Sequence, residues 1–165
     1  MTPLHRMTMA ALAAACFAAA GCAGSKPATR PDAPAPAANL DLTLAGDALF
    51  AFGKASIDDL SAQGRGQLDA FVARLQSADY GLVRIVGHSD RIGSDKANMT
   101  LSTRRAQAVR DYLVQHGIPD QKIVATGRGR YQPVATCERE KAQALIDCLA
   151  PNRRVEITVD PPFGR

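Results

Sequence analysis

The 165-residue chain has little aromatic surface and little net charge. Trp is absent, aromatic residues make up 5% of the sequence, and the formal charge is only +4. Proteins that bind nucleic acid usually combine a concentrated basic patch with aromatic side chains, whereas the basic residues here are dispersed. Composition therefore argues against a nucleic-acid partner, and so mild a charge excess gives only weak support for any other polyanion.

The sequence also lacks the common catalytic signatures. It has no Gly-x-Ser-x-Gly elbow, no carboxylates paired for acid–base work and no His-rich spacing suited to a metal. The run His88-Ser89-Asp90 contains the residue types of a hydrolase triad, but it lies in an expected strand, where Ser89 projects to the opposite face from its neighbours. We therefore expect a non-enzymatic protein without a metal or other cofactor.

The first 21 residues are typical of a secretory signal peptide. A short basic start at His5 and Arg6 precedes an Ala-rich apolar run at 7–20, which is too short to favour a membrane-spanning helix. The sequence Ala-Ala-Gly before Cys22 resembles a bacterial lipobox, although Leu is usual where Ala19 stands. The resemblance predicts a lipidated (palmitate-type) Cys22 and sorting to the outer membrane. Ordinary cleavage, leaving a soluble periplasmic domain, is the alternative.

The segment 22–40 combines the candidate lipidated cysteine with an Ala- and Pro-rich stretch. It contains four prolines and, before residue 40, no large apolar side chain, so it cannot form a core and is expected to be a semi-extended tether. Residues 41–165 remain, enough for one domain with its own core.

Four cysteines divide by position. Cys16 lies in the signal peptide, Cys22 is the lipidation candidate, and Cys137 and Cys148 lie in the folded region. In an exported protein the last two are expected to form a disulfide. A metal site is disfavoured because the carboxylates nearby are poor companions for thiolates around a soft metal.

The hydrophobic pattern of residues 41–165 alternates between strand and helix periods. Strands are expected at 48–52, 82–89, 123–126 and 153–159, and helices at 61–78, 98–116 and 138–149. Such alternation predicts an α/β fold, a two-layer sandwich with helices packed against one sheet.

One arginine lies inside the apolar stripe of the helix expected at 98–116. On an ideal helix Arg105 falls on the side of the large apolar residues, whereas Arg104 points towards solvent. A buried guanidinium needs a bidentate carboxylate or a polar pocket, because its desolvation is otherwise costly. Asp90, at the end of the preceding strand, is expected to lie near Arg105. The two form either a clamp for a zwitterion or a purely structural ion pair.

Several motifs in the same order resemble the OmpA-like peptidoglycan-binding domain. They are Gly-His-Ser-Asp at 87–90, Asn98, Leu-Ser-x-x-Arg-Ala at 101–106, Gly-Ile-Pro at 117–119 and Asn-Arg-Arg-Val-Glu-Ile at 152–157. The resemblance covers about Leu44 to Asp160. It implies an OmpA C-terminal-like fold with a mixed, four-stranded sheet, and it includes a cysteine pair at closely similar spacing.

The resemblance also implies a ligand, the diaminopimelate of peptidoglycan, which carries an amine and a carboxylate on one carbon. By this resemblance Asp90 binds the ammonium group, Arg105 binds the carboxylate and Asn98 supports them, with Ser89 and Arg153 as weaker contacts. Gly53 departs from the family pattern of Asn or Asp before a lysine, which implies that one hydrogen bond to the ligand is missing.

The implied function is noncovalent binding of peptidoglycan by a lipid-anchored outer-membrane protein whose domain lies in the periplasm. Such a protein tethers the outer membrane to the cell wall and supports envelope integrity. Other envelope proteins are possible partners. The alternative from the same resemblance is a protein-interaction subunit of an envelope or secretion complex.

Overall fold

The computed structural model describes residues 40–50 and 53–162. The chain divides into two compact units, and all the described residues belong to the second, Asp32–Arg165. The expected signal peptide and the lipidation candidate Cys22 lie outside the described residues, as does the expected tether except for Leu40. Among the described residues, no helix combines the length and the apolar character needed to cross a membrane.

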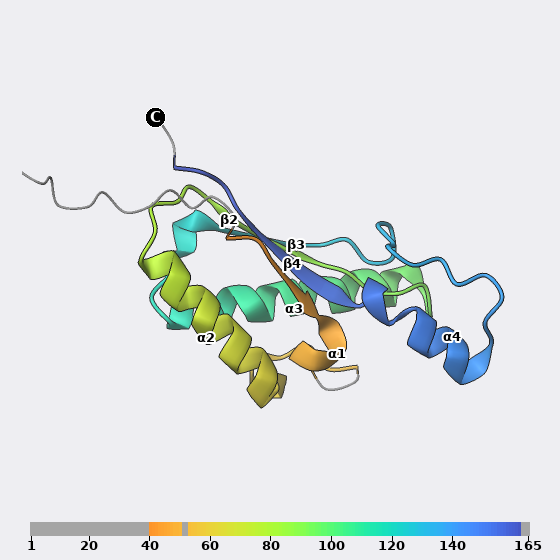
Figure 1. Cartoon of the computed structure of the whole chain (residues 1–165). Coiled ribbons are helices and arrows are strands. Elements are labelled where there is room, and N and C mark those ends of the chain that lie inside the picture. The colour runs from red at the N-terminus through yellow and green to blue at the C-terminus, as the bar shows by residue number, and fades with distance from the viewer. Residues whose placement is uncertain (1–39, 51–52, 163–165) are drawn as a thin grey trace, which may run out of the picture. The chain divides into compact units, whose positions relative to one another are not determined.

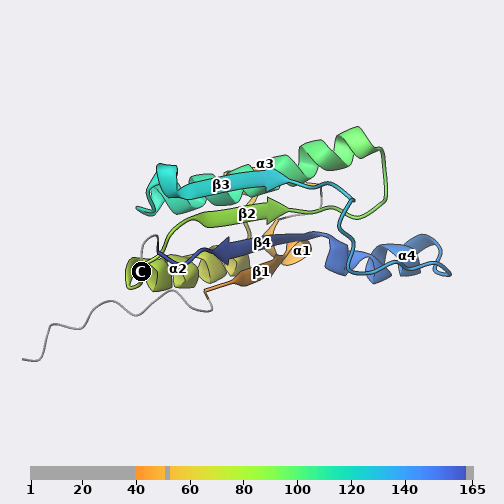
Figure 2. The same cartoon turned by 90° about the horizontal axis from the view of Figure 1, so that it is seen from above.

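Four strands form one mixed sheet with the spatial order β1-β4-β2-β3 (Figures 1 and 2). The two central strands, β4 and β2, pair antiparallel. At the edges, β3 pairs with β2 in parallel and β1 pairs with β4 antiparallel. Their bounds are β1 Leu42–Ala45, β2 Val83–Gly87, β3 Ile123–Gly127 and β4 Arg154–Val159. The expected α/β class and mixed four-stranded sheet are therefore confirmed.

The expected first strand at 48–52 is wrong. The edge strand is the earlier segment β1, and it is followed by a single helical turn, α1 Gly46–Leu49. The apolar side chains that suggested a strand are buried, Leu49 at 0% and Phe50 at 1% exposure, and Phe50 forms only an isolated bridge with Leu60. A short apolar run does not distinguish a strand from a buried turn.

Two long helices cover one face of the sheet, α2 Ala62–Gln76 and α3 Asp95–Gln115 (Figure 1). Helix α3 begins three residues before the expected start because the Ser94 hydroxyl caps it, accepting a hydrogen bond from the Ala97 amide at 3.2 Å. The last helix, α4 Ala142–Cys148, begins four residues later than expected and lies beyond the end of the sheet. Three short 3₁₀ turns complete the domain: Ile57–Asp59, Asp120–Lys122 and Ala150–Asn152.

Helix α3 lies unusually close to the sheet at one end of the paired strands β2 and β3. Gly87 and Gly127 are opposite each other in the register, and a Cβ atom on either would collide with Ser102 or Thr103 of α3. The absence of side chains at these two positions lets the helix settle against the strand ends. This close packing brings the buried face of α3 to the loop that leaves β2.

Candidate functional site

A small cavity opens where the loops after β2 and α4 meet the start of α3. Its volume is about 160 Å³, and ten residues from separate parts of the chain line it. They are Asp47, Gly53, Ser89, Asp90, Ile92, Asn98, Leu101, Arg105, Ile146 and Arg153. All five residues predicted from the sequence to bind the ligand are among them.

Arg105 is the largest fully buried side chain of the described residues, with 2% exposure. Its Nε donates a hydrogen bond to the Lys54 carbonyl oxygen at 3.1 Å, and its guanidinium carbon lies 5.5 Å from the centre of the Phe50 ring. Its Nη1 is buried and has no hydrogen-bond partner among the described residues. Burial lowers the pKa of Arg105, opposed by the charge of Asp47, yet an arginine stays protonated at any physiological pH.

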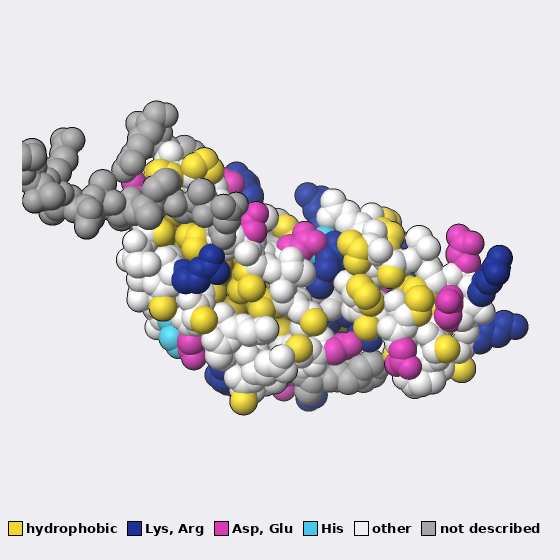
Figure 3. All heavy atoms as spheres, in the orientation of Figure 1, with side chains coloured by type: hydrophobic (Ala, Val, Ile, Leu, Met, Phe, Trp, Pro, Cys, Tyr) yellow, Lys and Arg dark blue, Asp and Glu magenta, His cyan; other side chains and the backbone are white. Residues whose placement is uncertain are grey.

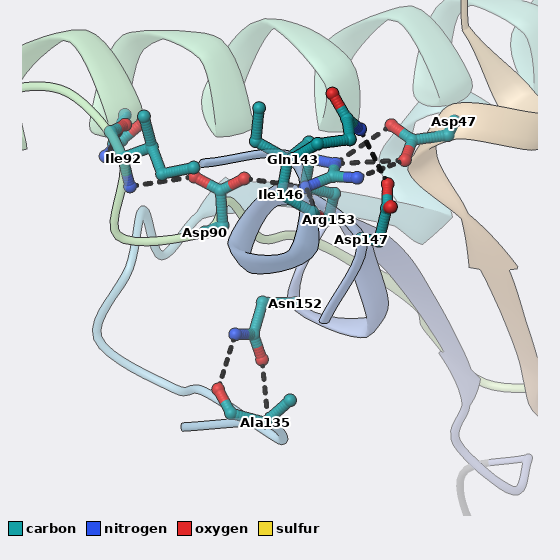
Figure 4. Close-up of polar contacts among 10 residues, drawn as sticks. Asp47, Asp90, Ile92, Ala135, Gln143, Ile146, Asp147, Asn152 and Arg153 are labelled. Carbon is teal, nitrogen blue, oxygen red and sulfur yellow. Dashed lines mark hydrogen bonds and ion pairs between the residues drawn. The ribbon is translucent and has the colours of Figure 1, made fainter. Parts of the chain in front are cut away.

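Arg153 lies between two carboxylates (Figure 4). Its Nη1 donates to Asp90 Oδ2 at 2.9 Å and to the Ile146 carbonyl at 3.0 Å, while Nε and Nη2 bind both oxygens of Asp47 at 2.6–3.0 Å. The hydrogen bonds that Arg153 donates to Asp47 and, to a smaller extent, to Asp90 raise the pKa of Arg153, against the effect of its burial. The side chains of Arg153 and Asp90 are each 11% exposed, so this ion pair is largely shielded from water.

Two further side chains shape the cavity. Asn98, in the first turn of α3, is 5% exposed and donates through Nδ2 to the Ile92 carbonyl at 3.1 Å, which fixes the loop after β2. Asp90 Oδ1 accepts from the Ile92 amide at 2.9 Å, so the same loop holds the carboxylate in place. The Ser89 hydroxyl is buried and has no hydrogen-bond partner among the described residues.

The cavity combines two carboxylates with two guanidinium groups and is close to neutral in total. One guanidinium is satisfied by both carboxylates, and the other, on Arg105, retains an unused donor. On the face seen in Figure 3, acidic and basic side chains are likewise interspersed rather than gathered by sign. A site of this kind suits a small zwitterion better than a polyanion, because it offers fixed charges of both signs at short range.

A family model described as the OmpA family matches residues 49–146. The chain belongs to the OmpA family. Outer membrane protein A of Citrobacter freundii is 49% identical over 135 residues, an alignment that covers 77% of this chain and 56% of that protein. The chain spans between about a third and just over half the length of the curated relatives it matches.

Solved structures of this family share the fold. The structure of the cell wall anchor of the T6SS from Pseudomonas aeruginosa is 34% identical with a TM-score of 0.58, and the alignment covers 73% of this chain and 80% of that one. The peptidoglycan-associated lipoprotein from Burkholderia pseudomallei is 25% identical with a TM-score of 0.58, over 72% of this chain and 89% of that one.

In this OmpA-family domain, the partner of Asp90 differs from the sequence-based expectation. Asp90 pairs with Arg153, and Arg105 has no ion pair within 4.0 Å among the described residues. The two residues expected to meet therefore face one cavity without joining each other. A purely structural ion pair between Asp90 and Arg105 is not what the structure contains.

The strand alternation used to separate Ser89 from its neighbours is also corrected. Strand β2 ends at Gly87, so His88, Ser89 and Asp90 lie in the following loop, and Ser89 lines the same cavity as Asp90. His88 points elsewhere: its Nε2 lies 3.4 Å from Glu156 Oε2, and burial together with the charge of Arg154 lowers its pKa. None of the described contacts joins these three residues into a relay.

Sequence reasoning missed Asp47, which anchors Arg153 at the cavity edge. It also missed the role of Asn152, whose side chain forms three hydrogen bonds, to the amides of Val134 and Ala135 and the carbonyl of Ala135, and so fastens the long loop before α4 (Figure 4). The sequence indicated Asn152 only as the first residue of the motif at 152–157, without predicting its contacts. No sequence pattern indicated the contact of Asp47 with Arg153, because the two residues lie 106 positions apart.

The two cysteines of the domain are joined in a disulfide, with their Cα atoms 6.1 Å apart. Together with Glu140 they form a group whose ligand-type atoms lie within 4.8 Å. Because both sulfur atoms are committed to the disulfide, they cannot bind a metal as thiolates. The bridge instead ties the loop before α4 to the end of that helix, and Arg91 Nη2 donates to the Cys137 carbonyl at 2.7 Å.

Proposed function

We propose that the chain binds diaminopimelate-type peptidoglycan noncovalently, with the side-chain amine and carboxylate of diaminopimelate in the cavity. Asp90 pairs with the ammonium group, Arg105 binds the carboxylate and Asn98 holds the site in shape. Ser89 and Arg153 make peripheral contacts. This is a binding function without a chemical step, and it requires no cofactor.

The observation that carries the proposal is the unused donor on Arg105. A buried donor without a partner costs about 1–3 kcal/mol, and more when it is charged, so folded proteins seldom keep one without a use. A carboxylate that enters the cavity accepts this hydrogen bond and neutralises a guanidinium that the protein has already desolvated. Most of the desolvation of the cation is therefore complete before the ligand arrives.

Arg153 and Asp47 prepare the other half of the clamp. Arg153 holds the Asp90 carboxylate at 2.9 Å while Asp47 holds Arg153, so Asp90 is fixed in position rather than free to turn. The ligand ammonium group then approaches a carboxylate that lines the cavity and is already held in position. Charge-assisted hydrogen bonds of this kind are roughly twice as strong as neutral ones.

We further infer that residues 1–21 are a signal peptide, that residues 22–40 carry a lipid on Cys22 and form a tether, and that residues 41–165 are the wall-binding domain. Such a protein lies at the outer membrane with its domain in the periplasm, and it joins membrane to wall to support envelope integrity. The similarity to a protein named for association with peptidoglycan and to a cell wall anchor supports this proposal. The second of these also favours the alternative, a subunit of a secretion complex.

Co-sedimentation of the purified full chain with diaminopimelate-type sacculi tests the proposal, with free meso-diaminopimelate as competitor. We expect pelleting by the wild type and its loss in Asp90→Asn, in Arg105→Met and with competitor. Asp58→Asn and Arg84→Met are matched controls on exposed positions outside the cavity. A folded wild type that does not pellet would contradict wall binding and leave the protein-interaction subunit as the better proposal.

A further inference from the structure

A larger groove adjoins the cavity and shares two of its lining residues, Gly53 and Leu101. We call it the basic groove. Its volume is about 650 Å³, and it is lined by the segment 53–56 with Asp59 and by residues at the start of α3: Ser94, Lys96, Ala97, Thr100, Leu101 and Arg104. Ala97, Thr100, Leu101 and Arg104 recur at helical spacing and form one face of α3. The cavity and the basic groove therefore border each other at Gly53 and Leu101.

The charge of the basic groove is one-sided. Lys54, Lys96 and Arg104 contribute three cations, all of them exposed, and none forms an ion pair among the described residues. The only carboxylate in the lining is Asp59, and its Oδ2 already accepts the Ser56 amide at 3.1 Å as part of a capping box. The positive end of the α3 dipole adds to the same field.

Another groove, which shares Ser89 with the cavity, is different. Its volume is similar, about 620 Å³, but its cations are engaged. Arg130 pairs with Asp95 at 2.6 Å, Arg91 donates to the Cys137 carbonyl, and Glu138 adds a negative charge. An anionic group attached to a ligand in the cavity therefore finds three cations without ion pairs in the basic groove, whereas the other groove offers only Arg91, beside the negative charge of Glu138.

We propose that the basic groove is a second subsite, which binds the free α-carboxylate of the D-glutamyl residue next to diaminopimelate in the peptidoglycan stem peptide. The inference rests on the proposed function, because diaminopimelate in the cavity brings its neighbour to the groove. The γ-linked glutamyl residue carries its α-carboxylate unsubstituted and adjacent to the diaminopimelate backbone. Solvent-exposed contacts of this kind are individually weak, so the groove adds selectivity to an affinity that the cavity supplies.

Binding of three ligands to the full chain, measured by titration calorimetry, tests this assignment. The ligands are free meso-diaminopimelate, the tripeptide L-Ala-γ-D-Glu-meso-diaminopimelate and the same tripeptide with the glutamyl α-carboxylate amidated. The test variant is Lys96→Ala/Arg104→Ala. The charge-matched control is Arg139→Ala/Lys141→Ala, two exposed positions that line neither groove nor the cavity.

We expect the wild type and the control to bind the acidic tripeptide about three- to tenfold more tightly than its amide. The test variant is expected to lose that preference while it binds free meso-diaminopimelate as the wild type does. Equal affinity of the wild type for the two tripeptides, or a preference that survives in the test variant, would overturn the subsite and leave the cavity intact. Failure of the wild type to bind free meso-diaminopimelate would overturn the proposed function itself.

Discussion

Replacing Arg105 with Met tests whether its guanidinium group is needed for ligand binding or for the stability of the fold. Met has a similar length and no charge, so Arg105→Met fills the space while removing every polar contact of the side chain. Breaking a buried ion pair from one side typically costs about 3–5 kcal/mol. Arg105, however, has no such pair among the described residues, so a much smaller loss of stability is expected.

The contacts that Arg105 does make give the magnitude. Its hydrogen bond to the Lys54 carbonyl contributes about 1.5–3 kcal/mol, and its position over Phe50 about 0.5–2 kcal/mol. Against these stand an unpartnered Nη1, which costs about 1–3 kcal/mol or more, and the sulfur–aromatic contact available to Met, about 0.3–1.5 kcal/mol. The free energy of unfolding of Arg105→Met is therefore expected within about 1 kcal/mol of wild type.

Urea unfolding followed by circular dichroism measures the stability, and calorimetry measures affinity for meso-diaminopimelate. Loss of a charge-assisted hydrogen bond to the ligand carboxylate is expected to weaken binding about 100-fold, equivalent to about 2.7 kcal/mol. Arg84→Met is the control, since Arg84 is half exposed and pairs with Asp160 at 2.9 Å on the surface. A loss of more than about 3 kcal/mol in Arg105→Met would refute the reasoning, because it is the cost expected of a structural charge.

The remaining predictions concern the rest of the charge network and the disulfide. Arg153→Met is expected to destabilise the domain by about 2–4 kcal/mol in urea unfolding, because it leaves the carboxylate of Asp90 shielded and unpaired; a loss below about 1 kcal/mol would show that the pair contributes little. Burial lowers the pKa of His88, so the folded state binds a proton at this residue less readily than the unfolded state, and the free energy of unfolding should fall as the pH drops below about 6.5. Measured by urea unfolding between pH 7 and 5.5, this fall should be smaller in His88→Gln than in the wild type. An equal fall in the two proteins would contradict the reasoning. The double change Cys137→Ser/Cys148→Ser removes a disulfide between residues 11 positions apart. It should lower the free energy of unfolding, measured by heat or urea, by about 2–3 kcal/mol and affect ligand affinity less. Two free thiols in the folded domain of the exported protein would show that the bridge does not form.

The sequence predicted the parts of the site that depend on local periodicity. The burial of Arg105 and the exposure of Arg104 follow from their places on α3, and both are as expected. The order of the strands and longer helices after residue 60 was also predictable, because α2, α3 and the strands carry apolar residues at helix or strand period. The first strand was misplaced because Leu49 and Phe50 fill the core from a turn, which gives the same apolar run as a strand.

The pairing of charges could not be predicted in the same way. Which guanidinium meets Asp90 depends on the antiparallel pairing of β4 with both β1 and β2, which brings Arg153 beside Asp47 and Asp90. No local pattern encodes a contact between residues more than 60 positions apart. The resemblance to a family placed all five residues in one site but did not say which of them are bonded to each other.

The central position of β4 has a consequence for the order in which the cavity can form. Because β4 is the last strand in the chain yet lies between β1 and β2, the cavity cannot be assembled until the final described segment has joined the sheet. A nascent or truncated chain that ends before Arg153 lacks both the arginine that positions Asp90 and the strand that closes the sheet. We therefore expect a chain that ends before Arg153 to lack the complete cavity.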